Sequence, residues 1–163
     1  MSSLSERIRG WYAPSTALAN EYQFSRFLLI RMLGLCYTVV FLGFVRQAPG
    51  LIGENGILPI ERYKDFLVQN YDGLSSVFWK LPSLFWFNYS DGFLVGAGWI
   101  GLIISVAVLC GYANSLMLLV LWTLQLSIVH TGQLFWSYGW ETQLLETGFL
   151  AMFLVPLFNG RPF

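Results

Sequence analysis

The sequence predicts an all-α, polytopic membrane protein with about four transmembrane helices, and with interfacial amphipathic helices in the N-terminus and the first long loop. Three observations support this fold class. Of the 163 residues, 56% are hydrophobic and only 11% are charged, whereas soluble domains carry about 25% charged residues. Apolar runs long enough to cross a hydrocarbon core of about 30 Å recur along the chain. All but one of the connections between these runs are short, so we expect a single membrane domain over residues 1–163.

The first predicted span covers residues 24–45, which are apolar apart from Arg26 and Arg31. Upstream of this span, Ser3 and Glu6 have capping-box spacing, and the apolar residues that follow share one helical face. We therefore expect a short N-terminal helix that lies flat in the membrane interface. The apolar run is too long for a cleaved signal peptide, so we interpret the span as a retained signal anchor.

A long connection follows over residues 46–91. Turn-forming residues open it, namely Pro49, Gly50, Gly53 and the pair Asn55-Gly56. From Pro59 the apolar residues fall on one face of a predicted helix, and a second amphipathic pattern begins at Leu74. The stretch from Trp79 to Tyr89 is rich in aromatic residues. We expect this interfacial loop to lie on the membrane or against a partner.

Two further spans, 92–110 and 115–129, are separated by a connection so short that they must form an antiparallel hairpin. The second span contains a GxGxxG pattern, but its apolar setting offers no place for a dinucleotide. Small residues four apart in this span predict close helix packing instead, at Gly92, Gly96, Ala97 and Gly101. The fourth span, 142–158, carries Glu146 and meets Pro156 near its end.

Four spans place both termini on one side of the membrane, side A, and the long loop on the opposite side, side B. Side A then holds Arg7, Arg9, Arg26, Arg31 and Arg161 against Glu6 and Glu21. Side B has an excess of carboxylates. An excess of Lys and Arg marks the cytoplasmic side, so the sequence predicts a cytoplasmic N-terminus.

Charged residues near the membrane need partners, because each costs at least about 2.5 kcal/mol near the bilayer centre. We expect Arg31 to reach toward the side A headgroups. For Glu146 we expect a structural contact with Arg46 on side B, or stabilisation by the N-terminus of its own helix. His130 is the single histidine, and we interpret it mainly as an interfacial residue. A catalytic alternative groups His130 with Glu141 and Glu146.

Aromatic residues on side B complete the candidate sites for contact with a partner. Trp136 and Trp140 cluster in the connection before the fourth span, and Trp86 lies in the long loop. An aromatic belt at the membrane surface is the simplest explanation of the first two. Together with Asn55 and Gly56 of the turn, these residues favour a protein partner over a small polar substrate.

Two stretches resemble the amino-terminal membrane region of the lipase maturation factor family. They are Phe27–Pro59, FLLIRMLGLCYTVVFLGFVRQAPGLIGENGILP, and Ser137–Pro156, SYGWETQLLETGFLAMFLVP. The residues that match the family pattern are Arg31, Pro49, Gly50, Gly53, Gly56, Leu58, Pro59, Glu146, Gly148 and Pro156. The resemblance implies a polytopic membrane protein with a cytoplasmic N-terminus. In eukaryotic members it implies help in the folding of secreted lipases in the endoplasmic reticulum, without known catalysis.

Family members normally continue into a large carboxy-terminal domain, whereas this sequence ends at Phe163. Our leading hypothesis is therefore a non-catalytic accessory subunit of a membrane complex, or an assembly factor, whose partners are other membrane proteins. A lipase-maturation helper is the first alternative, and a membrane enzyme acting on a lipid or quinone-like substrate is the second. A distant resemblance to vitamin K-dependent carboxylases finds no support, because the spans contain no lysine.

The same observations give expectations for ligands and location. We expect no intrinsic cofactor, no metal and no nucleic-acid partner, and we expect bound lipids from the surrounding bilayer. The sequence predicts an integral membrane protein, with a bacterial inner membrane favoured over the endoplasmic reticulum.

Overall fold

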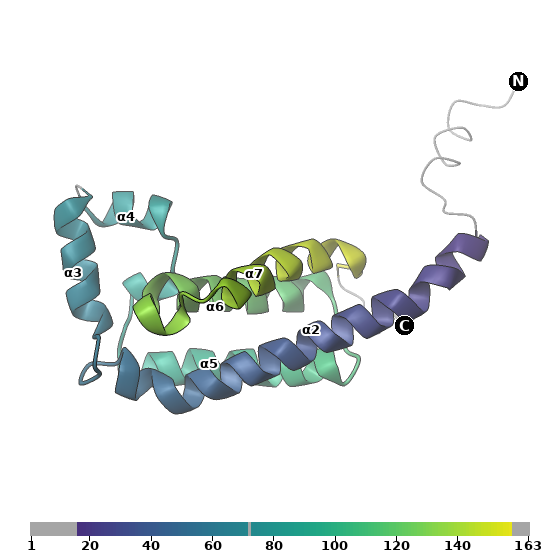
Figure 1. Cartoon of the computed structure of the whole chain (residues 1–163), viewed down its shortest axis with the longest axis horizontal. Helices are drawn as coiled ribbons and strands as arrows, with labels where there is room; N and C mark the ends of the chain where they lie inside the picture. Colours follow the sequence, from purple (N-terminus) through teal and green to yellow (C-terminus); the bar gives the residue numbers. More distant parts are fainter. Residues whose placement is uncertain (1–15, 72, 158–163) are drawn as a thin grey trace, which may run out of the picture.

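The computed structural model describes residues 16–71 and 73–157, with side chains from Tyr22 onward. The described chain is all-α (Figure 1). Its elements are α2 (Thr16–Leu51), α3 (Ile60–Asn70), α4 (Leu74–Lys80), η1 (Leu84–Trp86), α5 (Asp91–Leu109), α6 (Ser115–Thr131), η2 (Gln133–Trp136), α7 (Gly139–Ala151) and η3 (Met152–Leu154). The predicted N-terminal interfacial helix lies outside the described residues.

Helices α2 and α5 are apolar and long enough to cross a membrane, over Tyr22–Leu51 and Asp91–Leu109. Both agree with predicted spans, although α2 continues past residue 45 to Leu51 and contains Pro49. A proline this close to the end of a helix removes few hydrogen bonds. The backbone N–H groups of Ile52 and Gly53 both donate to the carbonyl of Ala48 and close the helix.

The main packing contact of the bundle is between α2 and α5, which run side by side (Figure 1). Glycines make this close approach possible, because a Cβ at Gly34 would lie 2.8 Å from the backbone nitrogen of Leu109. A Cβ at Gly101 would overlap the ring of Phe41, which is fully buried. Ala97 is also buried in α5. Small residues therefore set the distance between the two helices.

The predicted packing role of Gly92 and Gly96 is wrong. Both glycines are exposed, and a Cβ added at either would meet nothing within 4 Å. The seam includes Gly98 instead, where a Cβ would lie 2.7 Å from the side chain of Val45. Small residues recur on more than one face of α5, so their spacing alone does not show which face packs against another helix. In the structure, α2 covers the face that contains Gly98 and Gly101.

Helices α5 and α6 form the predicted hairpin. Gly111 turns the chain with a φ of 101°, in the region that favours glycine. Asn114 then caps α6, because its side chain accepts a hydrogen bond of 2.8 Å from the backbone N–H of Met117. The hairpin reverses the direction of the chain, so α6 runs antiparallel to α5.

Helix α7 packs on α6 and is shorter than the predicted fourth span, 142–158. It has 13 residues, about 20 Å at the rise of an α-helix, less than the hydrocarbon core of about 30 Å. The short helix η3 follows, and the chain leaves helical geometry at Val155, just before Pro156. Ser115 fixes this end, since its hydroxyl donates to the carbonyls of Met152 and Val155 at 2.6 and 2.9 Å.

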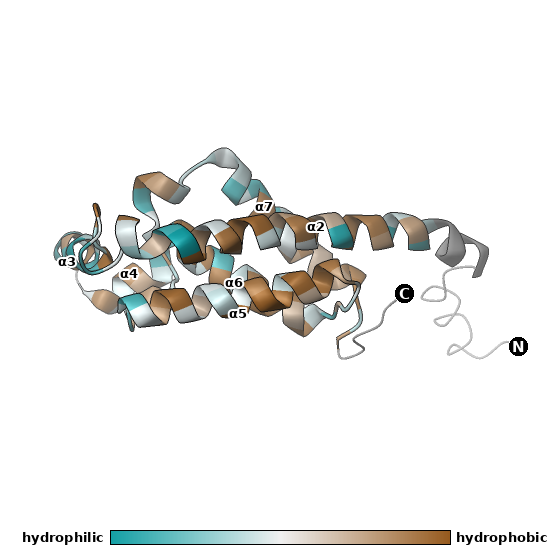
Figure 2. Cartoon of the chain, turned by 90° about the horizontal axis from the view of Figure 1, so that it is seen from below, coloured by the Kyte–Doolittle hydropathy of each residue, from teal (hydrophilic) through white to brown (hydrophobic). Residues whose placement is uncertain are grey.

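The long loop caps the side B end of the bundle, where α3 runs across the direction of the other helices and α4 follows it (Figure 1). Hydrophobic residues dominate the middle of α2 and α5, whereas α3 carries more hydrophilic residues (Figure 2). One contiguous core links bundle and loop. It contains Phe41 and Phe44 of α2, Ile60 of α3 and Phe85 of η1, each at most 1% exposed.

Candidate functional site

The side B end presents a surface of exposed apolar side chains on the long loop, which we call the aromatic cap. Trp79 is 85% exposed, Phe87 is 69% exposed and Phe66 is 61% exposed. Ile57 and Leu84 complete the aromatic cap. Exposed apolar residues of this size are candidates for contact with a protein or a membrane.

A folded turn anchors the start of the loop to α5. The side chain of Asp91 accepts a hydrogen bond of 2.9 Å from the backbone N–H of Glu54. Gly53 lies against Asp91 so closely that an added Cβ would overlap its carboxylate. Asn55 is exposed at the tip, and the N–H of Gly56 donates to the carbonyl of Gly53 at 3.0 Å. The chain therefore turns at the predicted place, from Gly53 to Gly56, with Glu54 and Asn55 as the central residues.

The middle of the loop is anchored to α6. Ser83 is 3% exposed and donates to the backbone carbonyl of Ser127 at 3.2 Å, while the Ser127 hydroxyl accepts from the N–H of Leu84 at 3.0 Å. The Nδ1 atom of His130 lies 2.8 Å from the carbonyl of Pro82. His130 thus has a structural contact, and these bonds fix the position of η1, which carries Leu84 of the aromatic cap.

Trp86 and Trp136, which the sequence suggested for partner contact, lie in the core. Trp86 is 1% exposed and donates from its indole nitrogen to the carbonyl of Leu81 at 2.6 Å. Trp136 is 6% exposed and packs edge-on against Phe44, with ring centroids 5.5 Å apart. Both residues are buried because the loop folds back on the end of the bundle. Trp140, at 51% exposure, stays accessible.

The catalytic alternative does not find its residues together. Glu141 is 2% exposed and accepts a hydrogen bond from the side chain of Gln125. Its partner is therefore an amide of α6, whereas His130 contacts Pro82. Glu146 is exposed on α7. The three side chains have separate surroundings, and the geometry offers no acid–base pair.

The expected contact between Glu146 and Arg46 is absent from the described residues. Both side chains are exposed, and no ion pair joins them. Gly148 lies against the hydroxyl of Tyr37, which fixes the register of α7 on α2. Arg46 lies nine residues beyond Tyr37 toward side B, whereas Glu146 lies only two residues from Gly148 in the same direction. The two charged residues are therefore about 10 Å apart along the helix axis, too far for an ion pair.

Arg31 lies near the C-terminal end of α5, and it has a partner that the sequence did not suggest. Its guanidinium donates to the carbonyl of Cys110 at 3.4 Å, at the C-terminal end of α5. The guanidinium carbon also lies 4.2 Å from the centre of the Phe27 ring. A cation near the C-terminus of a helix is favourable, because the last carbonyls carry partial negative charge.

Sequence reasoning missed several residues that hold these parts together. Gln125 is fully buried within α6, and a single amide inside an apolar span is a signal that could have indicated its role. Gln133, with a φ of 51°, donates to the carbonyl of Leu58 at 3.0 Å and connects η2 to the turn. No comparable signal marks Ser83 or Ser127, because serine is common in loops and membrane helices alike.

Most of the chain is similar to proteins of one known family. The model of the lipase maturation factor transmembrane domain matches residues 24–163. Lipase maturation factor 1 from Bos taurus is 37% identical over 154 residues, which cover 90% of this chain and 27% of that protein. The human protein is 37% identical over 157 residues, with the same coverage. Lipase maturation factor 2 from Xenopus tropicalis is 33% identical over 153 residues, covering 85% of this chain and 20% of that protein.

No solved structure matches the chain. The chain spans about a quarter of the length of the first relatives. The matching relatives are named as maturation factors rather than as enzymes, in agreement with the prediction of a non-catalytic protein. The match to a transmembrane domain, together with two helices long enough to cross a bilayer, supports an integral membrane protein. By the match over residues 24–163, the chain belongs to the lipase maturation factor family.

Proposed function

We propose that the chain is the membrane-embedded part of a folding helper for a secreted lipase. The observation that carries this proposal is the match of residues 24–163 to the transmembrane domain of the family, and the relatives described above are named for lipase maturation. The comparisons favour this alternative over the broader prediction of an accessory subunit in a membrane complex. The chain covers 27% of the length of lipase maturation factor 1. The proposal therefore assigns to this chain a part in the activity for which the longer relatives are named.

The topology supports contact between the aromatic cap and a secreted client. One crossing by α2 is enough to place the long loop on the side opposite the N-terminus. With a cytoplasmic N-terminus, the aromatic cap faces the lumen of the secretory pathway. A secreted lipase folds in that compartment, so Trp79 and Phe87 are accessible to it. We include four membrane crossings in the proposal, the last made by α7 together with η3.

The endoplasmic reticulum is the membrane that this proposal requires. The relatives named above are animal proteins, and a bacterial inner membrane receives no support from the comparisons. A client lipase is correspondingly the proposed partner, in place of the unspecified membrane subunits that the sequence suggested.

The architecture of the aromatic cap suits the binding of an incompletely folded protein. Its apolar side chains are exposed, while the backbone beneath them is fixed to α5 by Asp91 and to α6 by Ser83. A rigid surface loses little conformational entropy when it binds, so more of the interaction energy remains for affinity. Trp79 on α4 and Phe87 after η1 are the two most exposed aromatic residues of the aromatic cap.

The test is secretion of active lipase from cells that lack their own maturation factor. We expect expression of the chain to raise lipase activity per mass of secreted lipase without changing lipase synthesis. Replacing both Trp79 and Phe87 with alanine should reduce that gain several-fold, since buried aromatic contacts dominate many interfaces. The matched control replaces Ile103 of α5 and Leu150 of α7 with alanine. Both side chains are 65% exposed and lie outside the aromatic cap.

Two outcomes would contradict the proposal. If the chain reaches the membrane at normal levels but secreted activity per lipase mass does not change, the chain has no maturation activity. If the Trp79 and Phe87 variant performs as well as the Ile103 and Leu150 variant, the aromatic cap is not the surface that contacts the client.

A further inference from the structure

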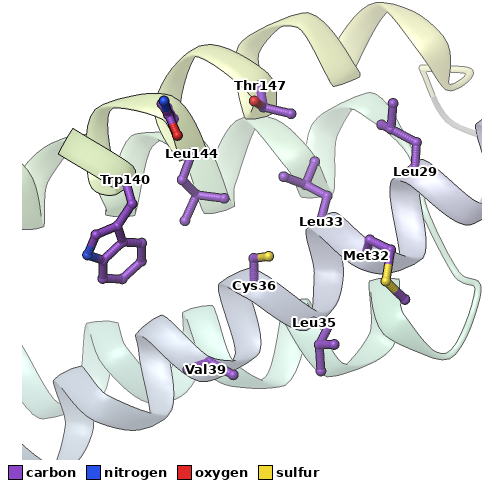
Figure 3. Close-up of a pocket in the computed structure, with 10 residues that line it drawn as sticks. Leu29, Met32, Leu33, Leu35, Cys36, Val39, Trp140, Leu144 and Thr147 are labelled. Carbon is purple, nitrogen blue, oxygen red and sulfur yellow. The ribbon is translucent and has the colours of Figure 1, made fainter.

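A groove opens between α2 and α7, and none of its lining residues belongs to the long loop (Figure 3). Its volume is about 580 Å³, within the range of about 300–1,000 Å³ typical of sites for single small molecules. Leu33 and Leu144, at 5% and 7% exposure, form its floor. Leu29 and Val39 mark the two ends of the α2 wall (Figure 3).

The groove lies at the depth of the hydrocarbon core. Its α2 wall is part of the apolar segment Tyr22–Leu51. From Leu29 to Val39 the helix rises about 15 Å, about half the thickness of the core. A partner helix that crosses the membrane would need a groove as long as the hydrocarbon core is thick. An acyl chain occupies one leaflet, so it needs a groove of about half that length.

Among the described residues that line the groove, the strong hydrogen-bonding side chains lie on the α7 wall, and the α2 wall adds only the weakly polar thiol of Cys36. Trp140, Gln143 and Thr147 line the α7 wall, and all three are exposed. Within the described residues, the indole nitrogen of Trp140 and the side chains of Gln143 and Thr147 make no hydrogen bond. Trp140 lies at the end of the groove nearest side B, opposite Leu29 (Figure 3). The end of the groove near Leu29 is thus apolar, and the donors of Trp140 and Gln143 lie toward side B. Thr147 lies farther along α7, in the middle of the groove (Figure 3).

A second groove of similar size, between α6 and η3, lacks this arrangement. Its volume is about 570 Å³. Ser115 is the single polar side chain among its lining residues, and the Ser115 hydroxyl already donates to the carbonyls of Met152 and Val155. This groove has no free side-chain donor for an ester or a headgroup, so the polar end distinguishes the groove at Trp140.

We propose that the groove between α2 and α7 binds one acyl chain of a membrane glycerophospholipid. The chain lies along Leu33 and Leu144, and the ester oxygens accept hydrogen bonds from Trp140 and Gln143. Tryptophan favours this position because its ring is apolar while its N–H bonds polar groups of the interface. The site is independent of the proposed action on a lipase, because it lies away from the aromatic cap.

The test uses the whole chain in phosphatidylcholine vesicles that contain a small fraction of phosphatidylcholine with a photoreactive group in its acyl chain. After irradiation, the lipid adducts are mapped by mass spectrometry. We expect adducts to concentrate on residues 29–39 and 140–147. Filling the groove with Cys36→Trp should lower the adduct yield there about tenfold, equivalent to about 1.4 kcal/mol of binding free energy.

Matched controls separate the site from general contact with lipid. Cys110→Trp changes the other exposed cysteine, at the end of α5, and should leave the yield unchanged. A second pair acts from the opposite wall, where Thr147→Phe should lower the yield and Leu150→Phe, outside the groove, should not. Because Thr147 is exposed, this pair tests the site even if Cys36→Trp impairs folding.

Two results would overturn the proposal. Adducts spread evenly over the lipid-facing residues of α5, α6 and α2 would show that the groove binds no particular lipid. Cross-links from residues 29–39 to a second protein chain, in place of lipid adducts, would show that the groove is an interface between helices.

Discussion

Among single residues, Gly101 has a large effect on packing, because a side chain there would overlap the ring of Phe41. We predict that Gly101→Val lowers the free energy of unfolding by about 1–3 kcal/mol, the usual cost of overpacking a core. Thermal or denaturant unfolding in detergent micelles measures the change. The matched control is Gly96→Val in the same helix, where an added Cβ meets nothing within 4 Å. Equal losses for the two variants would contradict the packing seen between α2 and α5.

Single residues also show where sequence reasoning reached its limit. The sequence predicts that Arg31 lies near a headgroup region, because an arginine is costly at the centre of the bilayer. Its contact with Cys110 could not be predicted, because the two residues are 79 positions apart. Likewise, Glu141 was recognised as a notable carboxyl group, but its burial against Gln125 depends on the register of α6 and α7. Contacts between distant segments require the fold.

At the scale of elements, the turn at the end of α2 depends on Asp91 at the first position of α5. Asp91 is the only side chain that bonds the backbone of Glu54 among the described residues. We predict that Asp91→Ala loosens the turn, because the N–H of Glu54 loses a charge-assisted hydrogen bond. Limited proteolysis in membrane vesicles should then cut residues 53–58 several-fold faster than in the unchanged chain.

Asp65→Ala is the control for this proteolysis experiment. Asp65 is an exposed carboxylate on α3 that bonds no other segment among the described residues, so its removal should leave the cleavage rate within error. If Asp91→Ala and Asp65→Ala are cut at the same rate, the turn is held by its own backbone hydrogen bonds. The contact between Asp91 and Glu54 would then contribute little.

Elements differed in how well the sequence predicted them. The spans at α2 and α5 follow from hydropathy, since nothing but an apolar helix fits such runs. The helix from Ile60 follows from Pro59 and the amphipathic pattern after it. The end of α7 could not be predicted, because its apolar residues continue past Ala151 while the chain changes to the short helix η3. The anchoring of that end by Ser115 is a tertiary contact.

On the scale of the whole molecule, the two proposals use two separate surfaces, the aromatic cap and the groove between α2 and α7. Because Trp86 and Trp136 are buried, the surface available to a partner is smaller than the sequence predicts. The same two residues pack the loop segments against the bundle, which fixes the position of the exposed residues around them. Hydropathy alone cannot distinguish a buried tryptophan from an exposed one in an aromatic loop. In the structure, η1 and η2 pack on the bundle and bury Trp86 and Trp136. The aromatic residues that do not take part in this packing remain exposed.

The orientation of the whole molecule gives the last prediction. With a cytoplasmic N-terminus, Ser75 of α4 lies in the lumen and Tyr22 of α2 lies near the cytoplasm. In a background with Cys36 and Cys110 replaced by alanine, a cysteine introduced by Tyr22→Cys should react with a membrane-impermeant maleimide on sealed, cytoplasm-out microsomes. A cysteine introduced by Ser75→Cys should react only after the microsomes are opened. Both side chains are exposed, so burial does not limit the reaction. Immediate labelling at position 75 would reverse the orientation and place the aromatic cap in the cytoplasm, away from any secreted lipase.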